Sequence, residues 1–198
     1  MSDMKTYDET LETLRAKIPE EQYIGVMYQP YCELSPGFLG FIQQYEIVSE
    51  LLPKDWKVID LGCGAAAQCF FFTEHAGYTG VDVLYDREAD PEDIMAGRYD
   101  STLRFESSNT THYEKDIESF IDENPEAFDD GKTLAVCVHV PDEEAVRTAE
   151  EKLDNILVYD PEKPVFFKAG LDEEIRQGIT ERLEKLRKTT VLVAEQSL

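Results

Sequence analysis

A buried strand that runs straight into a glycine turn constrains this chain more than any other feature. Residues 58–64 read VIDLGCG, and the apolar letters before the turn are typical of a strand inside a parallel sheet. Two glycines one residue apart let the backbone turn sharply and approach a ligand closely. Eighteen residues after Gly64, a second apolar run ends at Asp82. This order predicts a nucleotide-binding half-unit, in which an acid that ends the second strand holds a ribose.

From Trp56 onward, strand patterns alternate with helix patterns. We expect strands at 57–61, 78–83, 102–106, 133–140, 155–160 and 189–195, with a further apolar run at 164–168. The helices expected between and after them are 65–76, 110–123, 142–154 and 171–188. Strands separated by helices predict an α/β fold, with a Rossmann-like, mainly parallel sheet that carries helices on both faces.

The residues before this alternation have apolar positions at helical spacing, over 5–17 and again over 38–52, where Pro53 ends the pattern. We therefore expect an N-terminal helical cap or lid over residues 1–55. A Rossmann-like, cofactor-binding domain is expected over residues 56–198, and the two parts form one compact unit. The stretch 84–101 is expected to be a long acidic loop.

Charge limits the partners of this chain, because it has 42 acidic and 19 basic residues and a formal net charge of −23. Most of such a surface repels a phosphate backbone, so we expect no nucleic-acid partner. We favour solubility as the reason for the charge, with a cationic substrate or a basic protein partner as the alternative. No apolar run approaches the roughly 20 residues that cross a bilayer, and we see no signal peptide, so we expect a cytoplasmic protein without a membrane partner. The sequence leaves the oligomeric state open.

The four cysteines, Cys32, Cys63, Cys69 and Cys137, show neither a Cys-x-x-Cys pair nor the spacing of metal ligands. Three of them lie in or beside apolar segments, so we expect small core residues in a reducing compartment. No combination of His, Cys and acidic residues has metal-ligand spacing either, and we expect no metal site.

Two cofactors fit the glycine turn at residues 62–67. The letters GCGAAA match the dinucleotide fingerprint, which would make the chain a nicotinamide-dependent oxidoreductase. A pyrophosphate over this turn would be repelled by the neighbouring Asp60 carboxylate. S-adenosylmethionine (SAM) has no phosphate and carries a sulfonium and an ammonium. Asp60 suits that ammonium, directly or through water, while the amides of the turn suit the carboxylate of the same cofactor.

At these residues the chain resembles the class I, Rossmann-like SAM-dependent methyltransferases, over roughly residues 56–140. The resemblance rests on VIDLGCG at 58–64 and on GVDV at 80–83. It implies that SAM is the cofactor and that Asp60, Gly62 and Gly64 line its methionine end. The predicted cofactor-binding segment there is Asp60, Leu61, Gly62, Cys63 and Gly64.

The rest of the cofactor is assigned by the same resemblance, which implies that Asp82 binds the ribose hydroxyls and that Val83 packs on the adenine. The family often has an acid at the exit of the third strand, where this chain has Ser108 and Asn109. These two residues are candidates for hydrogen bonds to the adenine edge, and an N-cap of the next helix is their alternative role. A further departure is Ala66, which stands where the family has its third glycine.

His139 is the candidate catalytic residue, because it ends the fourth predicted strand, where members of the family place substrate-facing residues. A histidine there can take a proton from an oxygen or nitrogen nucleophile, and its alternative role is packing at a strand end. The Asn/Asp-Pro-Pro-aromatic motif of nucleic-acid methylating relatives is absent, which counts against methylation of adenine or cytosine. We therefore predict a SAM-dependent methyltransferase acting on a small-molecule substrate. A protein acceptor, the oxidoreductase and a SAM-binding protein without turnover remain the alternatives.

Overall fold

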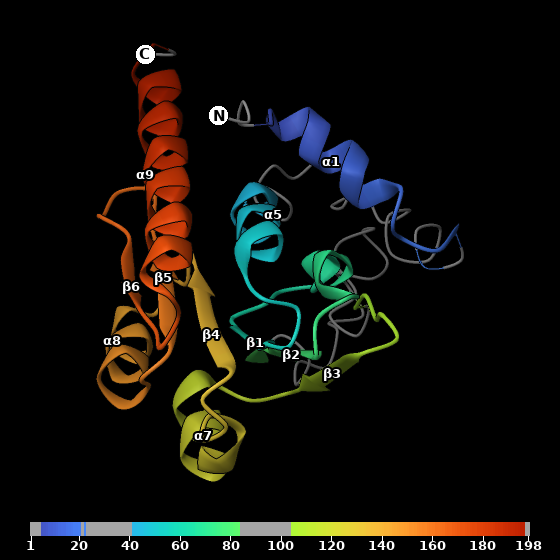
Figure 1. Ribbon diagram of the computed structural model, residues 1–198, viewed down its shortest axis with the longest axis vertical. Coiled ribbons are helices and arrows are strands. Elements are labelled where there is room, and N and C mark those ends of the chain that lie inside the picture. Colours follow the sequence, from blue (N-terminus) through green and yellow to red (C-terminus); the bar gives the residue numbers. More distant parts are fainter. Residues whose placement is uncertain (1–4, 21, 23–40, 84–103, 197–198) are drawn as a thin grey trace, which may run out of the picture.

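The computed structural model describes residues 5–20, 22, 41–83 and 104–196 (Figure 1). These residues form a six-stranded sheet in the order β3-β2-β1-β4-β5-β6. Strands β1 to β5 are parallel, and β6 is antiparallel to β5. The strands are β1 (Lys57–Leu61), β2 (Gly77–Val81), β3 (Thr110–Tyr113), β4 (Thr133–Val138), β5 (Ile156–Tyr159) and β6 (Phe166–Lys168). The predicted α/β fold with a mainly parallel, Rossmann-like sheet is confirmed.

Helices cover both faces of this sheet (Figure 1). Buried side chains of α1, α5, η1 and α9 join one hydrophobic core, and those of α7 and α8 join a second core on the opposite face. The helices are α1 (Tyr7–Arg15), α5 (Ile42–Leu51), α7 (Ile117–Glu123), α8 (Glu143–Lys152) and α9 (Glu173–Gln196), with short 3₁₀ helices η1 (Ala67–Phe72) and η3 (Pro125–Ala127). Helices α1 and α5 share a core with the sheet. The division into a cap over 1–55 and a domain over 56–198 stays a prediction.

Strand β1 alternates between these two cores. Val58 packs into the core that contains α5 and α9, whereas Ile59 and Leu61 pack into the core that contains α7 and α8. Successive side chains of a strand point to opposite faces, so Asp60 lies on the same face as Val58. Its carboxylate is directed toward α5 and is fully buried there.

The prediction was wrong around the third strand. Residues 104–107 have no regular structure, and β3 is Thr110–Tyr113, inside the segment predicted as a helix. The letters TTHY are β-branched and aromatic, which favours a strand. The helix of this region, α7, begins only after Asp116, whose side chain accepts a hydrogen bond from the Ser119 amide and caps it.

Two other expected elements differ. The predicted helix at 65–76 is the short 3₁₀ helix η1, and the predicted strand at 189–195 belongs to α9, which continues to Gln196. Once a helix is established, each further residue adds a hydrogen bond, and neither Gly nor Pro follows Gly178 to stop it. The apolar run at 164–168 contains β6, the antiparallel edge strand.

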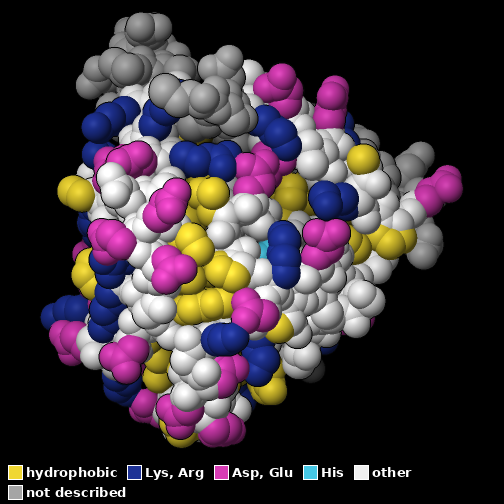
Figure 2. All heavy atoms as spheres, in the orientation of Figure 1, with side chains coloured by type: hydrophobic (Ala, Val, Ile, Leu, Met, Phe, Trp, Pro, Cys, Tyr) yellow, Lys and Arg dark blue, Asp and Glu magenta, His cyan; other side chains and the backbone are white. Residues whose placement is uncertain are grey.

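The described cysteines Cys63, Cys69 and Cys137 are buried, as predicted for small core residues. Cys32 and the predicted loop at 84–101 lie outside the described residues. None of the described helices is long and apolar enough to cross a membrane. Figure 2 shows hydrophobic side chains gathered near the middle of one face, with acidic and basic side chains around and among them. On this face, charges of both signs are therefore interspersed.

Candidate functional site

The glycine turn after β1 requires its glycines. Gly62 and Gly64 have φ angles of 84° and 56°, in the left-handed region that side chains rarely adopt. At Gly62 a Cβ atom would also lie 2.8 Å from Cγ2 of Val140. Ala66 adopts φ 59° as well, so the position where the resembled family has a third glycine has a left-handed backbone here too. The alanine is accommodated at a conformational cost of about 1–2 kcal/mol.

The amides of this turn are used within the protein. The amides of Gly62 and Cys63 donate to the carbonyl oxygen of Val81, at 2.8 and 3.2 Å, and the amide of Gly64 donates to Oδ2 of Asp82 at 2.8 Å. These bonds fasten the turn to the carboxyl end of β2. The turn amides were expected to bind a ligand carboxylate, whereas three of them bind the Val81 carbonyl oxygen and the Asp82 carboxylate.

Asp60 is the centre of a buried hydrogen-bond network. Its Oδ1 accepts from the hydroxyl of Tyr45 at 2.8 Å, and its Oδ2 accepts from the hydroxyl of Tyr78 at 2.5 Å and from Nε2 of Gln68 at 2.7 Å. The three donors come from α5, β2 and η1, so the carboxylate ties three elements together. Asp60 therefore lies behind the residues that face open space, instead of facing it directly.

Burial has a large effect on the acidity of this group. Desolvation raises the pKa of the Asp60 carboxyl to about 6, against the hydrogen bonds from Tyr78, Gln68 and Tyr45, which lower it. The pKa of Tyr45 and that of Tyr78 are raised well above 10, first by burial and then by the Asp60 charge. At neutral pH, an ionised carboxylate thus receives hydrogen bonds from two protonated phenols.

Two adjoining cavities open at the carboxyl ends of the strands. The first, here called the α5 cavity, has a volume of about 250 Å³. It is lined by Phe41, Ile42, Tyr45, Gly62, Cys63, Gly64, Gln68, Asp82, Val138 and His139.

The second, the α7 cavity, has a volume of about 560 Å³. It is lined by Gly62, Val81, Asp82, Val83, Lys115, Asp116, Ile117, Glu118, His139, Val140, Pro141, Asp142 and Ala145. The two cavities meet at the residues they share, Gly62, Asp82 and His139.

The structure brings most of the predicted site residues to these cavities. Gly62, Cys63 and Gly64 line the α5 cavity, Asp82 lines both, and Val83 lines the α7 cavity with 46% of its surface exposed. An exposed valine in a cavity offers an apolar surface to a flat ligand. The other two predicted residues of the segment, Asp60 and Leu61, are fully buried and lie behind the lining.

His139 lies where the two cavities meet. Its backbone has φ 51°, a strained value for a side chain other than glycine, and such strain is concentrated at functional sites. Its amide donates to the carbonyl oxygen of Tyr159 at 2.7 Å, which holds it at the end of β4. The imidazole is exposed and stacks on Phe41, with ring centroids 4.4 Å apart. The predicted candidate is thus in reach of both cavities, while its catalytic role stays a prediction.

Ser108 and Asn109 do not join this group. They precede β3 and so lie at the amino end of the sheet, because β3 is Thr110–Tyr113. Asn109 donates through Nδ2 to the carbonyl oxygens of Phe72 and His75, both at 3.0 Å, and so fixes the end of η1. The reason for assigning these two residues to an adenine edge is therefore removed.

Sequence reasoning missed several residues that line the cavities, among them Tyr45, Gln68, Asp116 and Ile117. Asp116 follows the carboxyl end of β3, and the hydrogen bond from the Ser119 amide lowers the pKa of its carboxyl. Its signal in the sequence is the N-cap pattern of an acid before an apolar helix face. Tyr45 and Gln68 carry no such local signal, because only the tertiary fold brings them to Asp60.

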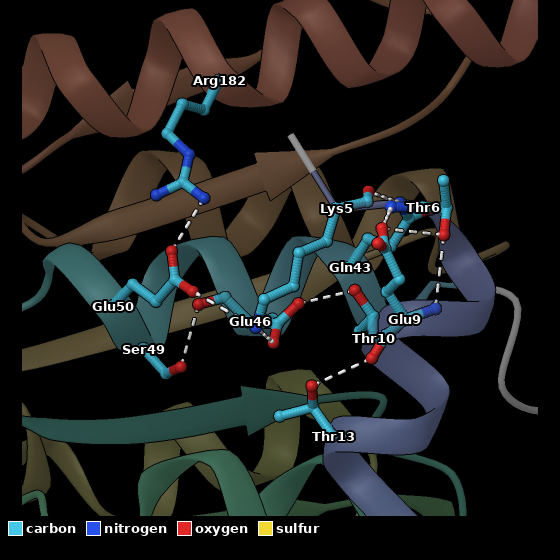
Figure 3. A network of polar contacts seen from close by, with 10 residues as sticks. All are labelled: Lys5, Thr6, Glu9, Thr10, Thr13, Gln43, Glu46, Ser49, Glu50 and Arg182. Atoms are coloured by element: carbon cyan, nitrogen blue, oxygen red, sulfur yellow. Dashed lines mark hydrogen bonds and ion pairs between the residues drawn. The ribbon is translucent and has the colours of Figure 1, made fainter. Parts of the chain in front are cut away.

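Helix α5 is held in position by polar contacts on two sides (Figure 3). Nζ of Lys5 lies 2.5 Å from Oε1 of Glu46, and the hydroxyl of Thr10 donates to Oε2 of Glu46 at 2.5 Å. On its other side, Arg182 of α9 donates to Glu50 at 2.8 Å. A buried carboxylate with two partners is costly to disturb. These contacts fix the helix that forms one wall of the α5 cavity.

The sequence matches no family model and no curated protein. Among solved structures, the chain is similar to a candidate type II methyltransferase from Anaeromyxobacter dehalogenans (12% identity, 60% of this chain and 47% of that one, TM-score 0.35). It is also similar to a cyclopropane-fatty-acyl-phospholipid synthase-like protein from Lactobacillus casei (11% identity, 76% and 57%, TM-score 0.40). A third is the plantazolicin methyltransferase BpumL, solved with a desmethyl-plantazolicin analogue and S-adenosylhomocysteine (SAH) (14% identity, 89% and 72%, TM-score 0.35). The chain spans about half the length of the first two proteins. Similarities this distant carry no argument about its activity.

Proposed function

We propose that this chain is a SAM-dependent methyltransferase that acts on a small-molecule acceptor. The observation that carries the proposal is the pair of adjoining cavities that meet at Gly62, Asp82 and His139. In open α/β sheets, ligands bind beyond the carboxyl ends of the strands, and these cavities lie there. Their volumes, about 250 and 560 Å³, suit a ligand with two unequal halves.

The proposed cofactor fits the residues present. The α7 cavity takes the adenine, with the exposed Val83 and the buried Ile117 as its apolar contacts. Asp82 lies where the cavities meet and accepts hydrogen bonds from the ribose hydroxyls. The methionine end occupies the α5 cavity beside Gly62 and Gly64. If bound, SAM would supply a methyl group on its sulfonium, which an acceptor would take by in-line attack on the methyl carbon while the sulfur leaves as the thioether of S-adenosylhomocysteine.

A dinucleotide fits these residues poorly. The amides of Gly62, Cys63 and Gly64 already donate to protein acceptors, so they are engaged before a pyrophosphate arrives. The carboxylates of Asp82 and Asp116 line the α7 cavity, where they would repel phosphate groups. These contacts favour a cationic cofactor without phosphate over a nicotinamide dinucleotide.

For the chemical step, we assign His139 to the acceptor. Its exposed imidazole lies at the junction of the cavities and can accept the proton that an oxygen or nitrogen nucleophile releases. Phe41, stacked on this ring, fixes the plane of the imidazole and adds an apolar wall. Because the methionine end of the cofactor takes up part of the α5 cavity, whose volume is about 250 Å³, the space left beside it favours a small-molecule acceptor over a protein segment.

The test is isothermal titration calorimetry with SAH and, in parallel, with NAD. We expect SAH to bind one to one and NAD not to bind. Asp82→Ala should weaken SAH binding by about tenfold or more, because a hydrogen bond to a charged group contributes about 1.5–3 kcal/mol. Asp55→Asn is the matched control, since it removes an exposed acid that pairs with Lys132 outside the cavities. Binding of NAD without binding of SAH would overturn the proposal.

A further inference from the structure

The network around Asp60 determines which polar groups the α5 cavity can offer a ligand. An ionised carboxylate only accepts hydrogen bonds, so each of its partners has to donate. The partners Tyr45 and Gln68 also line the cavity, while Asp60 itself lies behind them. The buried charge of Asp60 therefore controls the orientation of Tyr45 and Gln68, although Asp60 itself does not line the cavity.

Gln68 has its orientation fixed on two sides. Its Nε2 donates to Oδ2 of Asp60 at 2.7 Å and to the carbonyl oxygen of Cys63 at 2.8 Å. Both partners are acceptors, so turning the amide over would set three acceptors against one another. The two protons of the amide are used, and the carbonyl oxygen Oε1 is the group that Gln68 has left for the cavity.

Tyr45 is restricted in the same way. A phenol has one proton, and that of Tyr45 is donated to Oδ1 of Asp60 at 2.8 Å. The hydroxyl of Tyr45 can then only accept a further hydrogen bond. Asp82, which lines the same cavity, contributes a carboxylate. The polar groups of Gln68, Tyr45 and Asp82 thus all act as acceptors.

An ammonium group is the complement of such a set, because it carries three donors, a positive charge and no acceptor. We propose that Gln68 is a specificity-determining residue that binds the ammonium of the cofactor, and that Asp60 is a positioning residue that keeps Gln68 and Tyr45 in their accepting state. This inference rests on the proposed function, and it names the groups that recognise one end of the ligand. It also gives the buried Asp60 carboxylate an indirect role, because it acts on the ammonium through Gln68 and Tyr45 without contacting it.

The experiment compares two ligands by calorimetry: SAH, and its desamino analogue, in which hydrogen replaces the ammonium. We expect wild type to bind SAH about 10- to 100-fold more tightly than the analogue. Gln68→Leu should reduce this preference to less than about threefold, mainly by weakening SAH. Gln44→Leu is the matched control, because Gln44 is equally buried but lines neither cavity, and it should keep the wild-type preference.

Asp60→Asn tests the positioning role, since an asparagine can donate to Gln68 and release its amide. We expect the preference for SAH to fall although residue 60 does not line the cavity. If Gln68→Leu does not fold, as judged by circular dichroism, Tyr45→Phe takes its place as the test. Its preference for SAH over the desamino analogue should be about threefold or more below that of wild type. An unchanged preference in these folded variants would overturn the inference and leave the proposed function standing. Failure of wild type to bind either ligand would instead overturn the proposed function, and the inference with it.

Discussion

Replacing Asp60 with asparagine should make the stability of this protein depend differently on pH. The folded state holds the Asp60 carboxyl at a pKa of about 6, against an ordinary value of 3.8. Between these values the folded state binds the proton more tightly than the unfolded state does. Stability from this group is therefore complete below pH 3.8 and is lost as pH rises toward about 6.

The size of the effect follows from the two pKa values. The full loss corresponds to about 3 kcal/mol, of which about 1.4 kcal/mol falls between about pH 5 and about pH 8. This window stays above the isoelectric point of about 4.3, where the protein has little net charge to keep it in solution. Over this range, wild type should lose about 1.4 kcal/mol relative to Asp60→Asn, which is roughly a tenfold change in the ratio of unfolding constants.

Urea unfolding of both proteins at several pH values in this window measures the difference. The other titrating groups are common to both proteins, so their effects cancel in the difference between the two free energies of unfolding. The change of this difference with pH is the test, whereas its absolute size is not. Asp55→Asn provides the control: Asp55 is paired with Lys132, its pKa is lowered, and its difference from wild type should be flat over the same window. The account of a buried, destabilising charge would be refuted if the free energy of unfolding of wild type, relative to that of Asp60→Asn, stayed constant or increased as pH rises through this window.

Three further results are expected. Gly80→Ala should destabilise the fold by about 1–3 kcal/mol in urea unfolding, because its Cβ would lie 2.8 Å from both Sγ of Cys63 and Nδ1 of His112. In the same strand, Gly77→Ala, whose Cβ meets only Cγ of Lys57 at 3.8 Å, should be neutral or slightly stabilising, and equal effects would contradict the packing argument. Burial lowers the pKa of His75 to about 4, so wild type should lose stability relative to His75→Leu as pH falls from about 7 to about 5, and a constant difference would speak against it. Glu46→Gln should cost about 2 kcal/mol in thermal unfolding by breaking the contact with Lys5, and no loss would show that the contact is unimportant.

The glycine turn between β1 and β2 and the parallel strands around it were readable from the sequence, because their signals are local. Alternating strands and helices, the glycine turn at 62–64 and the acid at Asp82 each depend on a few neighbouring residues. Their positions at the carboxyl ends of adjacent parallel strands follow from the topology. Local pattern was therefore enough to place Gly62, Gly64 and Asp82 at the cavities.

The third strand was misplaced because a buried apolar residue in an irregular segment can be mistaken for part of a strand. Phe105 is buried and packs edge-on against Phe70, although its segment is not part of the sheet. Its amide donates to the carbonyl oxygen of Ala65, and its carbonyl contacts Nε2 of His112 at 2.9 Å. The described part of the predicted strand, residues 104–106, is thus irregular chain whose Phe105 packs on the core, and the prediction placed Ser108 and Asn109 at the wrong end of the sheet.

The role of Asp60 was out of reach for a different reason. Its partners Tyr45, Gln68 and Tyr78 come from three elements, and no spacing rule connects them to the glycine turn. Charge suggested that an acid beside the turn serves the ammonium of the ligand, directly or through water. The alternation of β1 directs that acid into the core instead, and the groups it orients line the cavity in its place.

The central claim is that one cofactor occupies both cavities, and a crystal structure of the complex with SAH tests it most directly. We expect the adenine beside Val83 in the α7 cavity, the ribose hydroxyls on Asp82, and the ammonium on Gln68 in the α5 cavity. Crystals grown with saturating SAH that show both cavities without it, or that show it bound elsewhere on the protein, would contradict the account.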